Sequence, residues 1–203
     1  ALARTLERRG FSVKMNQRVT APDAEVLILL SPPGTLDAFE ATSDEPLFPK
    51  LGRHSTSLTA VLFAQGIVDA IQPGLWDEAS VVESPAAASS SELPQRFMGL
   101  DIPQFYKNFR VDRSLDAKPV WRKEKLGPSS QRESMIFTNA ATNRPLITSK
   151  TIVFHDSFMD ASMDELSEYF ADITFIHWGE FRTQPDHVAA AISSADTVII
   201  EYV

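Results

Sequence analysis

The stretch TIVFHDSFMDASMDELSEYFADITFIHWGEFRTQPDHVAAAISSADTVIIEYV, residues 151–203, decides the fold class. Short apolar runs alternate in it with two segments in which apolar residues recur at three- and four-residue spacings. Such runs are typical of buried strands, and such spacings are typical of amphipathic helices. Strand, helix, strand, helix and strand joined by short links imply right-handed crossovers and a parallel sheet. The predicted strands are 151–154, 173–176 and 197–202, and the predicted helices are 158–170 and 185–194.

Outside this stretch the clearest element is a helix over residues 55–71, where leucine, valine and isoleucine repeat with helical spacing. Ser55, Thr56 or Ser57 can cap its N-terminus. The small and polar residues 77–91 predict a flexible linker or a surface loop. Further predicted elements are helices at 2–9 and 92–98 and strands at 11–15, 25–30, 105–111, 119–123 and 134–138.

These elements predict one domain over residues 1–203, a length that suits a single sizeable domain. We expect an α/β fold, a three-layer α/β/α sandwich with a mainly parallel sheet. Residues 105–138 would form a β-rich insertion in it.

The composition excludes several classes of protein. The formal net charge is −8, which argues against binding a nucleic-acid backbone. The chain has no cysteine, which excludes disulfides, thiolate metal sites and a cysteine nucleophile. No apolar run approaches the ~20 residues that a membrane-spanning helix needs. We therefore expect a protein that does not span a membrane and binds no nucleic acid. The spacing of its four histidines predicts no metal site either.

A serine stands where the strand at 151–154 meets the following helix, in the segment His155-Asp156-Ser157-Phe158. In open α/β sheets, ligands collect at the carboxyl ends of the parallel strands. A helix that starts there also directs unpaired N–H groups at the serine, and an oxyanion hole needs such donors. The alternative is that the aspartate and the serine only cap the helix. The pattern therefore predicts either acyl transfer through the serine or a capping role.

Several motifs resemble those of one known family. VFHDSF (153–158) resembles the GDSF block of SGNH hydrolases. The chain is more generally similar to the SGNH proteins of the alginate O-acetyltransferase type, which acylate bacterial exopolysaccharides. In that family the histidine block precedes the serine block, as His54 precedes Ser157 here. The segments that carry the resemblance, which covers residues 46–203, are 46–71, 92–103, 153–158, 175–178 and 195–203.

The resemblance implies an SGNH-hydrolase-like fold and a serine-dependent activity. The activity would be O-acyl transfer, with acetyl as the acyl group, to sugar hydroxyls of an exported polysaccharide, or esterase action on acylated carbohydrate. The partners would be a carbohydrate acceptor, an acyl donor and other polysaccharide-modification proteins, and no cofactor would be needed. The location would be periplasmic or extracellular, although the chain itself shows no signal-peptide pattern.

The resemblance also assigns roles to residues. Ser157 would be the nucleophile and His54 the general base. The oxyanion hole would consist of the N–H groups of Ser157 and Phe158 and the side chain of Asn139, with Asn143 as the second choice. The alternative is that both asparagines are only turn residues. Apart from the resemblance, His177 and Trp178 end a predicted strand at the same side as Ser157, so either they line the substrate site or they are a satisfied strand-end histidine and a packed tryptophan.

Three positions depart from the family's pattern. Gly52 stands at the family's aspartate, Ser55 at the tryptophan after the histidine, and His155 at the glycine of the GDSF block. The aspartate matters because it holds the imidazole in the tautomer that can act as a base. Three alternatives follow: another carboxylate replaces it, a serine–histidine dyad works without it, or the domain only binds carbohydrate or scaffolds an acetylation complex. The replacement carboxylates we consider are Asp37, Asp44, Glu45 and Asp156.

Overall fold

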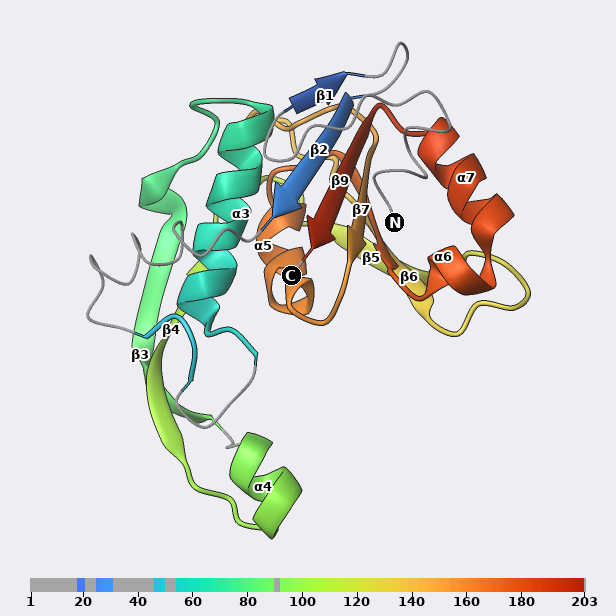
Figure 1. Cartoon of the computed structure of the whole chain (residues 1–203). Helices are drawn as coiled ribbons and strands as arrows, with labels where there is room; N and C mark the ends of the chain where they lie inside the picture. Colours follow the sequence, from blue (N-terminus) through green and yellow to red (C-terminus); the bar gives the residue numbers. More distant parts are fainter. Residues whose placement is uncertain (1–17, 21–24, 31–45, 50–53, 90–91, 203) are drawn as a thin grey trace.

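The computed structural model describes residues 18–20, 25–30, 46–49, 54–89 and 92–202 (Figure 1). Within them, a seven-stranded sheet has the strand order β1-β2-β9-β7-β8-β6-β5. Its strands are β1 (Arg18–Thr20), β2 (Glu25–Leu30), β5 (Val120–Lys125), β6 (Glu133–Thr138), β7 (Thr151–His155), β8 (Asp172–His177) and β9 (Thr197–Tyr202).

The sheet is mixed, with parallel strands at its centre and antiparallel strands at its edges. The pairs β2–β9, β9–β7 and β7–β8 are parallel. The pairs β1–β2, β8–β6 and β6–β5 are antiparallel. The α/β class is confirmed, but a mainly parallel sheet is wrong, because three of these six pairings are antiparallel. The short turn after β5 explains part of the difference, since strands joined by a tight turn can only pair antiparallel.

The parallel strands are covered on both faces. Successive side chains of a strand point to opposite faces. We call the seven-stranded sheet and the helices packed on it the body. Its helices are α3 (Ser57–Ile71), α5 (Met163–Ser167), α6 (Glu180–Thr183) and α7 (Pro185–Ser193), with 3-10 turns η1 (Glu78–Ser80) and η2 (Met159–Ser162). Val153, Phe175 and Ile199 pack with α3 and α5 on one face of the sheet. Phe154 and Ile200 pack with α7 on the other face.

The helices agree with the sequence in part. Thr56 is the N-cap of α3, and its hydroxyl accepts the N–H of Thr59, which confirms one of the three predicted caps. The helix predicted over 158–170 is shorter, because η2 precedes a single short helix, α5. The elements predicted at 2–9 and 11–15 lie outside the described residues.

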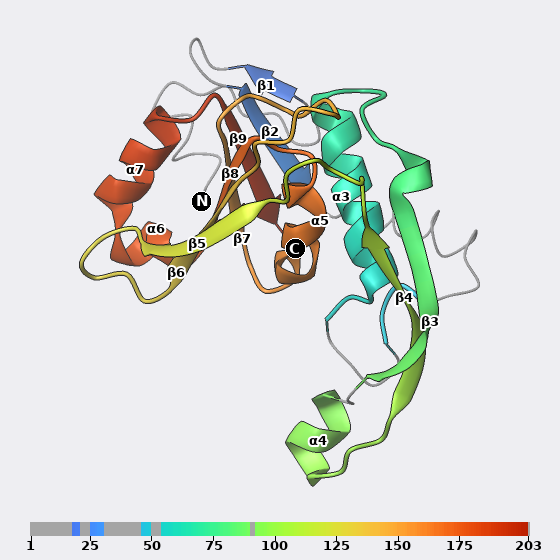
Figure 2. The same cartoon turned by 180° about the vertical axis from the view of Figure 1, so that it is seen from behind.

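A second, two-stranded sheet leaves the body beside α3. It consists of β3 (Val81–Ser89) and β4 (Gln104–Val111), with α4 (Glu92–Met98) at its far end (Figures 1 and 2). We call residues 81–89 and 92–111 the arm. The prediction of a linker over 77–91 is wrong, because the backbone of β3 pairs antiparallel with β4. Composition did not reveal this, since a ladder of backbone hydrogen bonds depends on the partner strand and tolerates small side chains.

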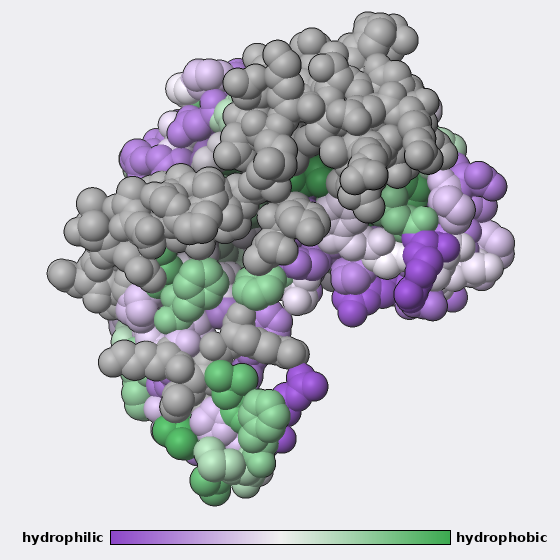
Figure 3. Space-filling view, viewed as in Figure 1, coloured by the Kyte–Doolittle hydropathy of each residue, from purple (hydrophilic) through white to green (hydrophobic). Residues whose placement is uncertain are grey.

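The far end of the arm is apolar at its surface. Green, hydrophobic side chains gather around α4 at the lower end of the space-filling view (Figure 3). The exposed large apolar residues there are Phe97, Met98, Leu100, Ile102 and Phe105. Among the described residues, helices fall short of the length and apolar character needed to cross a membrane.

Candidate active site

Ser157 lies on the turn that follows β7, at the carboxyl end of the parallel strands. The N–H of Phe158 donates to Asp156 Oδ1 at 2.8 Å, which closes a tight turn around the serine. Ser157 is half-buried, and neither its N–H nor its hydroxyl bonds to another described residue. The turn η2 that follows has no side-chain cap. The hydroxyl of Ser157 is therefore not used to cap a helix.

A buried carboxyl group supports this turn from β9. Glu201 is 3% exposed, and its Oε2 accepts the N–H of Asp156 at 2.9 Å. Its backbone carbonyl accepts the indole N–H of Trp178 at 2.8 Å. Burial raises the pKa of Glu201 from its ordinary 4.5 to about 8, and the neighbouring carboxylates of Asp156 and Asp160 contribute. Glu201 is thus mainly protonated at neutral pH.

His54 reaches the serine turn from the start of α3. The N–H of Thr56 donates to the carbonyl of Leu47 at 2.9 Å, and its hydroxyl donates to the same carbonyl at 3.1 Å. These bonds fix the chain just after His54. The imidazole meets the ring of Phe158 edge-on, with 6.0 Å between the ring centroids. The structure therefore brings His54 beside the residue that follows Ser157.

Glu92, the first residue of α4, contacts His54 from the arm. Its Oε1 lies 2.5 Å from Nδ1 of the imidazole, and both side chains are about one-third exposed. A carboxylate only accepts hydrogen bonds, so an ionised Glu92 makes Nδ1 the donor of this bond, and Nε2 is then the ring nitrogen that can act as a base. Glu92 thus places a carboxylate beside the imidazole, which is the group that the family's aspartate would supply and that Gly52 lacks. The sequence analysis did not consider Glu92, because the contact spans 38 residues and the arm was interpreted as a linker.

Of the four carboxylates that the sequence suggested, Asp156 is the one that the structure describes, and it does not take this place. The side chain of Asp156 accepts the N–H of Phe158 instead of supporting the imidazole. The other three lie outside the described residues, as does Gly52. They are Asp37, Asp44 and Glu45.

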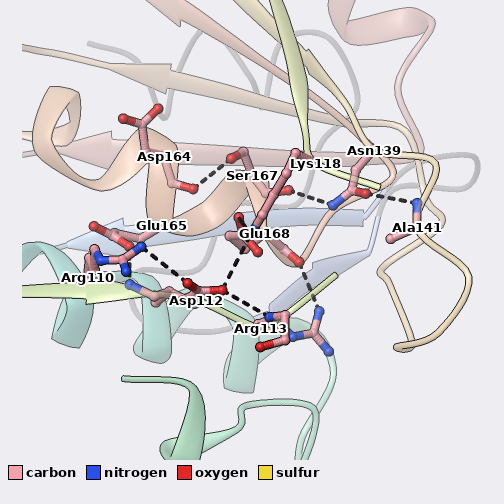
Figure 4. A network of polar contacts seen from close by, with 12 residues as sticks. Arg110, Asp112, Arg113, Lys118, Asn139, Ala141, Asp164, Glu165, Ser167 and Glu168 are labelled. Atoms are coloured by element: carbon pink, nitrogen blue, oxygen red, sulfur yellow. Dashed lines mark hydrogen bonds and ion pairs between the residues drawn. The ribbon is translucent and has the colours of Figure 1, made fainter. Parts of the chain in front are cut away.

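Asn139 does not meet Ser157. It follows β6, which runs antiparallel to β8, whereas the serine follows β7, which runs parallel to β8. The two residues therefore lie at opposite ends of the strands, on opposite sides of the sheet along the strand direction. The Asn139 amide donates to the carbonyl of Ser167 at 3.2 Å and accepts the N–H of Ala141 at 3.0 Å (Figure 4). The expected role of Asn139 in an oxyanion hole fails because the strand before it runs in the opposite direction.

The second choice, Asn143, is engaged elsewhere too. It accepts the N–H of Asp116 at 3.1 Å and donates to the carbonyl of Ser114 at 3.0 Å. The N–H of Phe158, also expected in the oxyanion hole, is bound to Asp156. Of the expected donors, the N–H of Ser157 remains available.

His177 is the last residue of the neighbouring strand β8 and Trp178 follows it, at the same ends of the strands as Ser157. His177 pairs in register with His155, and its Nδ1 accepts the N–H of Gly179 at 3.0 Å. Burial lowers the pKa of both histidines, so both are neutral at neutral pH. Trp178 stacks on Phe181, with 5.0 Å between the ring centroids. This contact places the indole in the packing between the sheet and α6.

Comparison with known proteins finds similarity at the level of structure. No family model and no curated protein matches the sequence. A DHHW family protein from Eubacterium siraeum DSM 15702 superposes with a TM-score of 0.53 at 12% identity, over 81% of this chain and 61% of that protein. The likeness is one of fold. Bacillus cereus PatB1 gives a TM-score of 0.52 at 10% identity, over 99% of this chain and 85% of PatB1.

A second PatB1 structure, which carries a sulfonyl adduct, gives a TM-score of 0.51 at 12% identity, over 77% of this chain and 60% of that one. The chain thus spans about three fifths of the DHHW family protein and of this PatB1 structure. These neighbours correct the assignment to the alginate O-acetyltransferase type. The resemblance rested on short motifs, and the structures that share the fold include a DHHW family protein and PatB1.

Proposed function

We propose that this chain is a serine-dependent O-acyltransferase that moves an acetyl group to a sugar hydroxyl of an exported polysaccharide. Water in place of the sugar would make the same chemistry an esterase. The observation that carries the proposal is the position of His54 between the Glu92 carboxylate and the ring of Phe158, the residue that follows Ser157. A nucleophile, a base and a carboxylate behind the base are the parts that serine acyl transfer requires.

In the proposed reaction, Ser157 Oγ attacks the carbonyl carbon of the acyl donor while Nε2 of His54 takes the hydroxyl proton. The tetrahedral intermediate collapses, the leaving group receives that proton, and an acetyl-serine remains. The acceptor hydroxyl then gives its proton to Nε2 and attacks the acetyl-serine. Collapse of the second intermediate returns the proton to Ser157 and releases the acetylated sugar. Glu92 stabilises the imidazolium that forms in each half of the reaction.

The competing function is binding of carbohydrate without catalysis. One observation favours it: of the expected oxyanion donors, the N–H of Ser157 is the only one that bonds to no other described residue. Removing one donor from an oxyanion hole commonly costs about 10²–10³ in kcat. A site with one donor would therefore be slow unless the substrate or the rest of the chain supplies another.

Incubation with a chromogenic acetyl ester, followed by intact mass measurement, separates the two functions. We expect ester turnover or an added acetyl group in the natural protein. Ser157→Ala should lower turnover by at least about 10³-fold, because it removes the nucleophile. Ser129→Ala, at an exposed position in the turn after β5, is the matched control and should behave as the natural protein. A folded natural protein with neither turnover nor adduct would point to binding alone.

A further inference from the structure

Two carboxyl groups face each other beneath the serine turn. The Oε2 of Glu201 accepts the N–H of Asp156, and the Oδ1 of Asp156 accepts the N–H of Phe158. The two bonds, of 2.9 and 2.8 Å, lie on either side of Ser157 along the backbone. Glu201 is buried and comes from β9, a strand that runs beside β7 in the core. The turn is thus attached to the sheet through a side chain that the proposed reaction does not use.

The groups around this pair are mostly acidic. Asp156 and Asp160 face Glu201 from the loop after β7 and from η2. His155 lies within 3.5 Å of Asp160, and its pKa is lowered by burial. His177, beyond it on β8, also has a lowered pKa. Since neither histidine is charged at neutral pH, none of these described groups would balance a second negative charge on Glu201.

We propose that Glu201 is a positioning residue for the nucleophile: its buried carboxyl group bonds to the N–H and to the side chain of Asp156, and so holds the Ser157 turn in one shape. The proposal rests on the proposed function, since it takes Ser157 as the nucleophile. A protonated carboxyl can accept and donate at the same time, whereas a carboxylate can only accept. The side-chain hydrogen bond with Asp156 likewise favours the protonated form of Glu201.

This arrangement makes the turn sensitive to alkaline pH. Because burial raises the pKa of Glu201 to about 8, the group ionises as the pH passes that value. The new charge repels the carboxylate of Asp156, which then no longer holds the N–H of Phe158 in place. The kcat of the natural protein should therefore fall above about pH 8, while KM stays nearly constant.

The test compares Glu201→Gln with Glu201→Ala. Glutamine keeps an acceptor for Asp156 N–H and a donor for the Asp156 carboxylate, and it cannot ionise. Glu201→Gln should keep kcat near the natural value at pH 7 and lose the decline above pH 8. Glu201→Ala removes both bonds and should lower kcat by roughly 10²-fold, the effect of a small misplacement of a reacting group.

Amide hydrogen exchange gives a readout that does not depend on catalysis. The Asp156 and Phe158 amides should be protected in the natural protein and in Glu201→Gln at pH 7. Protection should fall by at least about tenfold in Glu201→Ala, because local opening becomes easier. Equal protection in the alanine variant, or an equal loss in both variants, would overturn the proposal. If the natural protein neither turns over the ester nor forms an adduct, acyl transfer fails, while the exchange data still decide whether Glu201 holds the turn.

Discussion

The body and the arm each supply part of the candidate site, and they are built differently. Ser157 follows β7, whose five residues are all buried. Glu92 opens α4 in the arm, where Phe97 is 77% exposed. The position of the nucleophile is therefore set by core packing, whereas the support of the base depends on one polar contact from a surface element. Core substitutions should mainly affect stability, and arm substitutions should mainly affect activity.

The largest expected effect is on the stability of the body. Phe175 in β8 is fully buried and packs edge-on against Phe137, with 5.8 Å between ring centroids. Phe175→Ala should lower the free energy of unfolding by about 3–5 kcal/mol, since it leaves a cavity in the core. Phe97→Ala in the arm should change it by less than about 0.5 kcal/mol, because that side chain is exposed. Urea denaturation measures both, and similar losses in the two variants would remove the contrast between body and arm.

The next largest effect is the loss of enzymatic activity caused by a substitution in the arm. Glu92→Gln removes the charge that supports His54 and should lower kcat by about 10²–10⁴-fold, with the unfolding midpoint unchanged. Glu83→Gln is the matched control, because it removes an arm carboxylate that pairs with Lys107 at 2.9 Å. It should leave kcat as it is. Steady-state kinetics with the chromogenic ester decide the point, and equal kcat values in the two variants would show that Glu92 has no part in the reaction.

The smallest expected effect is on the pH dependence of stability, and it arises where the arm joins the body. Glu165 in α5 accepts the N–H of Val111, at the end of β4, at 2.6 Å. Burial raises its pKa from 4.5 to about 7, and Asp164 and Glu168 add to the shift. Between about pH 4.5 and 7 the folded chain therefore binds more protons at Glu165 than the unfolded chain, so stability falls as the pH rises.

Glu165→Gln should make that fall shallower, because an amide does not titrate. Denaturation curves at several pH values between 4 and 8 measure the slope for the natural protein and the variant. Glu201 contributes to the slope in both proteins, so the difference between them isolates Glu165. Identical slopes would mean that the pKa of Glu165 is the same in the folded and in the unfolded chain.

The sequence predicts the body better than the arm for a physical reason. Residues 151–203 carry their signal in local periodicity, and the three strands predicted there are present. β3 is different, since its small residues become a strand only through pairing with β4. Local pattern does not specify such a distant partner.

The residues of the candidate site also differ in how well the sequence predicts their positions. The position of Ser157 at the end of β7 could be predicted, because the strand and the turn are adjacent in the sequence. Asn139 was misplaced because the direction of β6 depends on its pairing with β8 rather than on its own residues. The contact of Glu92 with His54 could not be predicted, because it joins two segments 38 residues apart and no local sequence pattern indicates that they meet.

The most direct test of the account is the labelling of Ser157 by a sulfonyl fluoride, a reagent class that modifies activated serines. Peptide mapping should place the adduct on Ser157, and His54→Ala and Glu92→Gln should both slow labelling by at least about 10²-fold. An adduct on another residue, or an unchanged labelling rate in both folded variants, would contradict the claim that Ser157, His54 and Glu92 act as one unit.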